Sequence, residues 1–468
     1  TDKEGSLLST AKPAENKMGV MPVGRLLASM AVPMMISMLV QALYNIVDSV
    51  FVSRISEDAL TAVSLAFPLQ NLMIAVCAGT TVGMNALLSR SLGAKEQDRA
   101  DRAANTGIFL ALCSFVLFCA IGLTLSRAFF AVQTDSAVIA KYGADYSAVC
   151  LGCSIGLFLQ ITFERLLQST GRAHLSMISQ IVGACINIVL DPILIFGLFG
   201  FPRLEVVGAA VATVVGQWVG ATLGLILNLK CNPDIHLSLR HIRWHGPTVR
   251  AIYHVGFPSI AMMCIGSVMV FGINRILLGF TSTAAAVFGA YFKLQSFIFM
   301  PIFGLNNGMV PIIAYNYGAR NAKRVKGTIK LAVCTAICIM IVGTILFESI
   351  PGVLLSFFDA SEGMLAIGVP ALRIIGIHFV LAGFCIPAGS VCQAIGNPVY
   401  SLIVSVCRQL VVLLPAAWLL AQTGVLDLVW LAFPIAELVS LTLSAIFLRK
   451  TLRAAESTMS EPPDGLLV

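Results

Sequence analysis

Apolar residues in this sequence fall in runs of about twenty or more, and each run is long enough for a helix to cross the hydrocarbon core of a membrane. The runs lack the ten-residue alternation of outer-membrane barrels. With 58% hydrophobic residues, 11% charged residues and a mean hydropathy of +0.90, the chain has too few polar groups to cover a water-soluble globule. The sequence therefore predicts an integral membrane protein and excludes soluble enzymes and secreted disulfide scaffolds.

Twelve helical spans are predicted, and the fold class is an all-α membrane protein with two six-helix lobes. The spans of the first half are residues 26–52, 60–88, 103–126, 137–164, 175–197 and 207–229, and those of the second half are 251–279, 284–313, 328–350, 364–387, 399–421 and 428–448. We accordingly divide the chain into an N-terminal tail (1–22), an N-terminal lobe (23–229), an inter-lobe loop (230–250), a C-terminal lobe (251–450) and a C-terminal tail (451–468). The polar residues before the first span predict no cleavable signal peptide.

The two halves of the sequence are copies of each other. Adding 225 to a position in the first half gives its counterpart in the second half without a gap. Leucines in two apolar segments could match by chance, but matching glycines, glutamines and prolines indicate a duplication. Such pairs include Pro33/Pro258, Gln70/Gln295, Gly83/Gly308, Gln168/Gln393 and Gly171/Gly396. Because each copy has an even number of spans, we expect a pseudo-two-fold axis along the membrane normal.

The basic residues predict the orientation. If the N-terminus is cytoplasmic, 22 of the 30 lysines and arginines fall on the cytoplasmic side and four fall outside, while the other four lie within spans. Such a bias marks the cytoplasmic loops. We therefore predict a multi-pass protein of the inner (plasma) membrane with both termini in the cytoplasm. The net charge of +7 then reflects topology, and we expect no nucleic-acid partner.

Several chemistries are excluded or disfavoured by the motifs. The sequence has no G-x-x-x-x-G-K-[ST] motif and no soluble insertion large enough for an ATPase domain, so an ion gradient is the expected energy source. The 13 cysteines are scattered through apolar runs and are interpreted as small apolar residues. No histidine cluster or activated nucleophile appears in the spans, so we predict that the protein is not an enzyme.

Acidic residues inside the spans are the strongest functional candidates, because a charge at the membrane centre costs about 2.5 to 3.5 kcal/mol on insertion scales. On the first span, one helical stripe of polar residues is expected to face a cavity or another helix: Gln41, Tyr44, Asn45 and Asp48. The fifth span repeats this pattern with Gln180, Asn187 and Asp191, and Pro192 loosens the helix beside the acid. The other acids within spans are Asp145, Glu164 and Glu437.

Asp48 and Asp191 both lie toward the outer ends of spans that run outward, so they can share one depth. Two carboxylates that meet in a dry pocket bind protons or a cation, because desolvation and mutual repulsion oppose two unpaired charges. Asn187 and a hydroxyl would add neutral oxygens, so the site suits H+ or a hard monovalent cation such as Na+. The alternative is that these acids only hold helices together through hydrogen bonds. We expect no cofactor besides the coupling ion.

These features together resemble the multidrug and toxic compound extrusion (MATE) transporters. The resemblance rests on the duplicated six spans, on Pro33 and Asp48 fifteen residues apart, on Asn187-x-x-x-Asp191-Pro192, and on the turns Gly93-Ala94-Lys95 and Gly318-Ala319-Arg320. It covers about residues 23–450 and is closest to the bacterial DinF and MepA-type branch. It implies two lobes arranged as a V around a central cavity, and antiport in which entry of H+ or Na+ drives export of organic cations by alternating access.

The resemblance also implies roles for single residues. Thr213, at the end of the stretch GAAVAT (residues 208–213), matches a threonine that helps to hold the coupling ion, so a Na+ site would comprise Asp48, Asn187, Asp191 and Thr213. Glu164 matches a functional glutamate of MepA-type exporters, and Tyr146 matches a cavity tyrosine. We expect drug-like small molecules and membrane lipids as partners, and a monomer.

The second half departs from this pattern. The repeat counterparts of Asp48, Asn187 and Asp191 are Ile273, Val412 and Ala416, so the acids are not duplicated. The C-terminal spans instead carry Arg275, Lys293, Arg373, Arg408 and Glu437. An unpaired charge in a span is costly, so we predict that Arg408 pairs with Glu437 and that Lys293 helps to shape the cavity. These cations leave open the alternative of a flippase for lipid-linked precursors, since related flippases share the two-lobed construction.

Overall fold

The computed structural model describes residues 15–460, and the parts of the predicted tails at 1–14 and 461–468 lie outside the described residues. The helices of the N-terminal lobe are α2 (Val23–Ser53), α3 (Glu57–Gly93), α4 (Gln97–Gln133), α5 (Ala137–Gly152), α6 (Ile155–Ser169), α7 (Ala173–Phe196) and α8 (Glu205–Cys231). The C-terminal lobe contains α9 (Gly246–Leu278), α10 (Ser282–Gly318), α11 (Ala322–Ser349), α12 (Pro351–Ser356), α13 (Glu362–Gly376), α14 (Phe379–Ile395), α15 (Pro398–Val406), a π-helical segment η2 (Cys407–Leu413), α16 (Leu414–Ala421), α17 (Leu426–Val429) and α18 (Ala432–Ser460).

The predicted twelve spans are confirmed among the described residues. Ten are long, apolar helical units, and two are pairs of helices that bend, by 46° between α5 and α6 and by 50° between α13 and α14. The sequence predicted these two spans as continuous helices, which is wrong. In each pair a glycine, Gly152 or Gly376, ends the first helix, and a glycine lowers helix propensity at such a point.

The duplication is visible in the element boundaries. Adding 225 to the bounds of α3 gives the bounds of α10, and adding 225 to the start of α7 gives the start of α15. The caps repeat as well, because Ser56 and its counterpart Thr281 each accept a hydrogen bond from the backbone three residues later. After α3 and α10, Lys95 and Arg320 adopt the left-handed backbone region at φ 61° and 57°. The two halves therefore share these helix bounds, caps and turn conformations at positions that are 225 residues apart.

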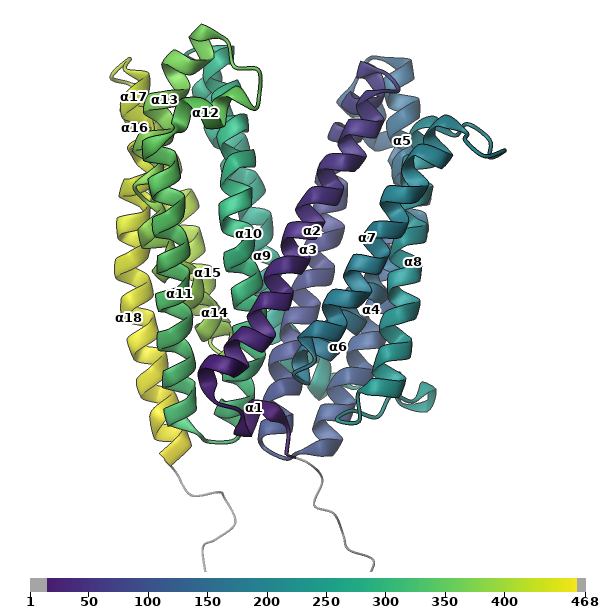
Figure 1. Cartoon of the computed structure of the whole chain (residues 1–468), viewed down its shortest axis with the longest axis vertical. Coiled ribbons are helices and arrows are strands. Elements are labelled where there is room, and N and C mark those ends of the chain that lie inside the picture. Colours follow the sequence, from purple (N-terminus) through teal and green to yellow (C-terminus); the bar gives the residue numbers. More distant parts are fainter. Residues whose placement is uncertain (1–14, 461–468) are drawn as a thin grey trace, which may run out of the picture.

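The lobes meet at the end of the molecule where both described chain ends lie, and their helices diverge toward the opposite end (Figure 1). At the junction the C-terminal ends of α3 and α10 touch, with Gly93 against the Tyr315 carbonyl and its counterpart Gly318 against the Arg90 carbonyl. Any side chain at either glycine would collide with backbone, so close approach of the two lobes requires glycine here.

Helix α2 leaves its own lobe in its first half and packs on α10, where Gly304 and Gly308 fit against the backbone of α2. The equivalent contact in the repeat places Gly79 and Gly83 of α3, the counterparts of Gly304 and Gly308, against α9. Between Ser37 and Val52 no residue of α2 is buried, and this second half of the helix diverges from α10 (Figure 1), while α2 also packs on α7. This half carries the polar stripe that includes Asp48.

Candidate ion-coupling site

The candidate site lies in the N-terminal lobe, where α2, α7 and α8 pack side by side. Two glycines bring α7 and α8 into close contact. A Cβ atom at Gly216 of α8 would lie 2.7 Å from the Gly183 carbonyl oxygen and 3.1 Å from the Asn187 Cβ atom. The small residues therefore let the backbones approach until polar side chains of α7 and α8 meet inside the lobe.

The first polar contact at this interface joins Asn187 and Thr213. The Asn187 side-chain amide donates to the Thr213 hydroxyl at 3.2 Å, and that hydroxyl donates to the Ala209 carbonyl at 3.0 Å. Asn187 is 3% exposed, and its own carbonyl oxygen has no hydrogen-bond partner among the described residues. The geometry therefore aims an unused neutral oxygen into the lobe, one helical turn from Asp191.

Asp48 of α2 and Asp191 of α7 come close enough for their carboxyl groups to interact directly. Asp191 is fully buried, and neither of its oxygens has a hydrogen-bond partner among the described residues. The same holds for Oδ1 of Asp48. Two ionised carboxylates cannot bond to each other because neither carries a donor, whereas a shared proton or a cation would join them. The unpaired oxygens therefore form one cluster.

Pro192 lies inside α7 directly after Asp191. Because proline has no N–H group, the carbonyl of Ile188 lacks its usual helical donor. This carbonyl belongs to the same helical turns as Asn187 and Asp191. The free Ile188 carbonyl thus adds a backbone oxygen to the side-chain oxygens near the two acids.

The polar stripe of α2 continues this region toward the chain ends. The Gln180 amide donates to Gln41 at 3.1 Å and joins α7 to α2. Tyr44 is within electrostatic range of both Asp48 and Asp191. Asn45 is exposed. The structure therefore brings Tyr44 near the acids and Gln41 to Gln180, while Asn45 lies on the exposed side of the helix.

Glu164 and Tyr146, the other candidates of the N-terminal lobe, have partners of their own. Glu164 on α6 is 7% exposed and accepts a hydrogen bond from Gln160 at 2.9 Å. Tyr146 is buried between α3 and α5, where its hydroxyl accepts from Gln70 at 3.2 Å. Glu164 lies within electrostatic range of Tyr44, so it belongs to the same polar region of the lobe.

Arg165 forms a contact between the lobes that the sequence did not indicate. Its guanidinium donates to Asn307 of α10 at 2.9 Å and to Gln168 at 3.0 Å. The distribution of basic residues predicts only that Arg165 lies on the cytoplasmic side. Its position beside Glu164 could have indicated a contact, since two adjacent charges at a span end need separate partners.

The C-terminal lobe confirms one predicted pair. Arg408 lies in the π-helical segment, and its guanidinium is 3.5 Å from the carboxylate of Glu437 on α18. Glu437 is 3% exposed, and its Oε1 has no hydrogen-bond partner among the described residues. Lys293 is exposed on α10, with its ammonium 6.0 Å from the centre of the Phe358 ring. The structure therefore keeps these cations apart from the acids of the N-terminal lobe.

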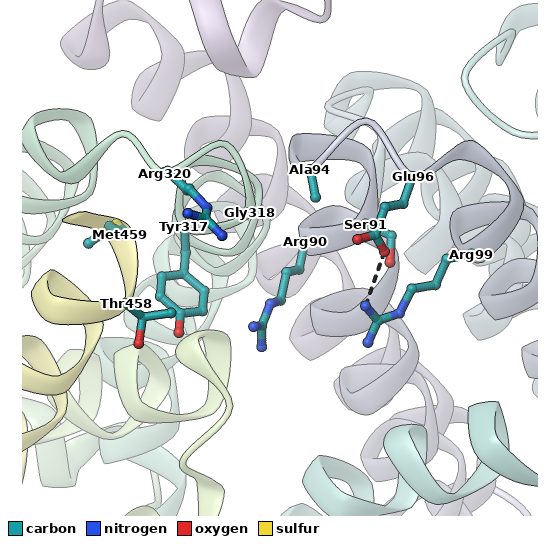
Figure 2. A pocket seen from close by; sticks show the side chains of 10 residues that line it. All are labelled: Arg90, Ser91, Ala94, Glu96, Arg99, Tyr317, Gly318, Arg320, Thr458 and Met459. Carbon is teal, nitrogen blue, oxygen red and sulfur yellow. Dashed lines mark hydrogen bonds and ion pairs between the residues drawn. The ribbon is translucent and has the colours of Figure 1, made fainter. Parts of the chain in front are cut away.

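A small pocket of about 140 Å³ lies at the junction between the lobes (Figure 2). Arg99 forms an ion pair with Glu96 at 3.0 Å, and Arg90 stacks on the Tyr317 ring at 4.7 Å. These contacts join the ends of α3 and α4 to the end of α10. The pocket therefore marks the closed end of the V, away from the two acids.

Comparison with known proteins decides the family. The sequence model of the MatE family matches residues 33–193 and 258–419, one stretch in each copy of the repeat. This chain belongs to the MATE family. Its membership confirms the resemblance predicted from the motifs, and the two-lobed membrane fold agrees with it.

Two relatives and one solved structure illustrate how this MATE protein compares with others. The multidrug export protein MepA of Staphylococcus haemolyticus is 29% identical over 318 residues, which cover 67% of this chain and 69% of the relative. The FAD transporter of Shewanella oneidensis is 26% identical over 422 residues, which cover 89% and 92%. A crystal structure of a MATE protein in complex with MaL6 superposes with a TM-score of 0.89 at 25% identity and covers 95% of this chain and 100% of that chain.

Proposed function

We propose that this MATE protein is a secondary active exporter that moves amphipathic, mostly cationic small molecules out of the cell in exchange for H+ or Na+. The observation that carries this proposal is the cluster of unpaired buried oxygens on Asp48, Asn187 and Asp191. Buried polar groups in proteins nearly always have partners. A cluster in which several oxygens lack one therefore supports a site for a transient ligand.

The donor set fits H+ or a hard monovalent cation. All candidate ligand atoms are oxygens, which belong to the two carboxyl groups, to Asn187 and Thr213, and to the backbone near Pro192. A proton would give one carboxyl group the donor that it needs to bond to the other. A cation would satisfy both acids and the Asn187 carbonyl at once. When bound, the ion supplies positive charge between α2 and α7, and these residues hold it there.

Coupling follows from the asymmetry between the lobes. The repeat counterparts of the two acids and of Asn187 are hydrocarbon, so the ion acts on the N-terminal lobe alone. An ion that binds one conformation about tenfold more tightly shifts the equilibrium between the two conformations by up to about tenfold, which corresponds to about 1.4 kcal/mol. The α7 segment beside Pro192 lacks one helical hydrogen bond and is the element that responds by bending. Substrate then loses space or its counter-charge in the cavity and leaves outward.

The test is a transport assay with purified protein in liposomes. A cationic fluorescent dye is followed under an imposed pH gradient, an imposed Na+ gradient, both or neither. The substrate panel includes FAD, because one relative is a FAD transporter and Lys293 is exposed in the C-terminal lobe. It also includes a fluorescent lipid-linked precursor, which tests the flippase alternative. We expect gradient-dependent dye export and no lipid translocation.

Matched variants separate the coupling site from general damage. Asp48→Asn and Asp191→Asn preserve side-chain shape and remove the titratable group, so each is expected to abolish gradient-driven export. Glu348→Gln, which changes an acid near the end of α11, is the control and is expected to transport normally. Dye export by both aspartate variants at the rate of the control, or lipid translocation without dye export, contradicts the proposal.

A further inference from the structure

The short helix α1 (Lys17–Val20) lies at the end of the molecule where the lobes meet (Figure 1). A helix of four residues is not stable by itself, so neighbouring groups must hold it in place. Its cap residue Asn16 provides one anchor. The Asn16 amide donates to the Thr170 carbonyl at 2.9 Å, in the turn between α6 and α7, while Asn16 Oδ1 accepts from the backbone N–H of Met18 at 3.0 Å. This end of α1 is bound to the N-terminal lobe.

The other side of α1 is bound to the C-terminal lobe. The Met18 side chain is fully buried in the hydrophobic core that α10 and α11 share with the start of α2. The Met18 carbonyl accepts hydrogen bonds from Asn316 at 3.0 Å and from Arg324 at 2.9 Å. The Arg324 guanidinium also donates to the Met21 carbonyl at 2.7 Å. Residues 16–21 thus bridge both lobes.

We propose that residues 16–21 form a latch that holds the two lobes together at this end and releases when the lobes separate there. The reason is geometric, because the Thr170 turn and the ends of α10 and α11 must stay adjacent for both anchors to persist. Opening at this end moves them apart, so one anchor must break. The weaker anchor should break first, and hydrogen bonds to charged groups are roughly twice as strong as neutral ones.

The two anchors differ in strength. The C-terminal anchor comprises a buried methionine and two charged hydrogen bonds, whereas the N-terminal anchor has one neutral hydrogen bond across the lobes and the packing of Lys17 and Met18 beside Gly171. We therefore expect the bond between Asn16 and the Thr170 carbonyl to break first, with Met18 remaining in the C-terminal lobe. The latch then moves with α10 and α11.

The first measurement is the distance between the lobes at this end. Asp98 and its repeat counterpart Lys323 are exposed at the starts of α4 and α11, one in each lobe. Each is replaced by a bioorthogonal amino acid that carries a spin label, so the native cysteines stay. Asn16→Ala and Arg324→Gln are expected to raise the ratio of separated to closed lobes about tenfold, which corresponds to about 1.4 kcal/mol. Lys330→Gln, an exposed substitution on α11, is the control and should match the wild type.

The second measurement detects a rare open state. Trypsin cleaves after Lys17 only when both anchors of α1 are released, so the cleavage rate reports the fully released population. Arg324→Gln leaves the cleavage sequence unchanged and is expected to accelerate this cut about tenfold, while Lys330→Gln does not. Neither readout needs substrate or a coupling ion, so its result is independent of the proposed export function.

The outcomes separate a latch from local fraying. Faster cleavage together with a larger inter-lobe distance supports the latch. Faster cleavage with an unchanged distance means that α1 frays without holding the lobes, which overturns the proposal. Wild-type behaviour of both Asn16→Ala and Arg324→Gln in the distance measurement also overturns it. A thermal melt of each variant excludes unfolding as the cause of a shift.

Discussion

Asn187 on α7 donates a hydrogen bond to Thr213 on α8, and this bond forms where Gly216 lets the two helices touch. The placement of these two residues of the proposed ion site therefore depends on a residue that has no side chain. In the C-terminal lobe the counterparts of Asn187 and Thr213 are Val412 and Leu438, and the corresponding interface carries the Arg408–Glu437 ion pair instead. The residues of the proposed ion site therefore have no polar counterparts in the C-terminal lobe.

Gly216→Val tests this dependence. The added side chain must displace the Gly183 carbonyl or Asn187, so α7 and α8 separate and the Asn187–Thr213 bond is lost. Overpacking of this kind costs about 1 to 3 kcal/mol. We expect a lower melting temperature and loss of ion-driven export. Gly289→Ala is the control, since nothing lies within 4 Å of its added Cβ atom. Equal transport by the two variants would mean that the helix contact does not position the site.

Asp191→Asn has a second expected effect, on stability. Asp191 is fully buried with both oxygens unpaired among the described residues, so an ionised carboxylate there is costly. An amide removes that cost, and the thermal stability of the variant should not respond to Na+. The wild type is expected to melt at a higher temperature in Na+ than in a large organic cation at equal ionic strength. Parallel Na+ responses in both proteins would place the cation elsewhere.

The Arg408–Glu437 pair predicts a strongly non-additive double-mutant cycle. Breaking a buried pair by removing one partner costs about 3 to 5 kcal/mol, whereas replacing both charges with apolar groups costs much less. Arg408→Met leaves the 3% exposed Glu437 without its cation and should be the most destabilising single change. The double variant Arg408→Met/Glu437→Leu should recover most of the lost stability in thermal unfolding. Additive losses would show that the two residues do not act as a pair.

Much of this architecture follows from the sequence because its signals are local or repeated. The spans appear as long apolar runs, and the register of 225 predicts the matching bounds of α3 and α10. Arg408 and Glu437 could be paired because opposite charges are rare within adjacent spans. The proximity of Asp48 and Asp191 was likewise predictable, since both acids lie at one depth on polar helical stripes.

Other features have no sequence signal of this kind. The bond from Arg165 to Asn307 joins residues of different lobes, and no periodicity relates the two positions. The latch helix is a single turn, too short for a hydrophobic pattern to define it. The breaks after Gly152 and Gly376 lie inside runs that are apolar throughout, so composition alone favours continuous helices. Tertiary contacts decide such features.

The last prediction concerns the pH dependence of the latch. Burial, and to a smaller extent the positive charge of Arg172, lowers the pKa of Lys17 below its ordinary value of 10.5 when α1 is docked. Released α1 therefore binds this proton more tightly than docked α1. Docking must become more favourable as pH rises from the lowered pKa toward 10.5, and it lacks this gain at lower pH.

Lys17→Met removes the titrating group and serves as the comparison. Because Lys17 is only partly buried, solvent screening limits the effect to less than about 1 kcal/mol, or about fivefold in the ratio of released to docked α1. We expect the distance between labels at Asp98 and Lys323 to shift toward the closed value in the wild type as pH rises through this alkaline window. The variant should lie nearer the closed value already at neutral pH, because it has no buried charge beside Arg172, and should respond less to pH. Identical pH profiles for the two proteins would show that Lys17 does not titrate with the docking of α1, and that the latch depends on Asn16, Met18 and Arg324 alone.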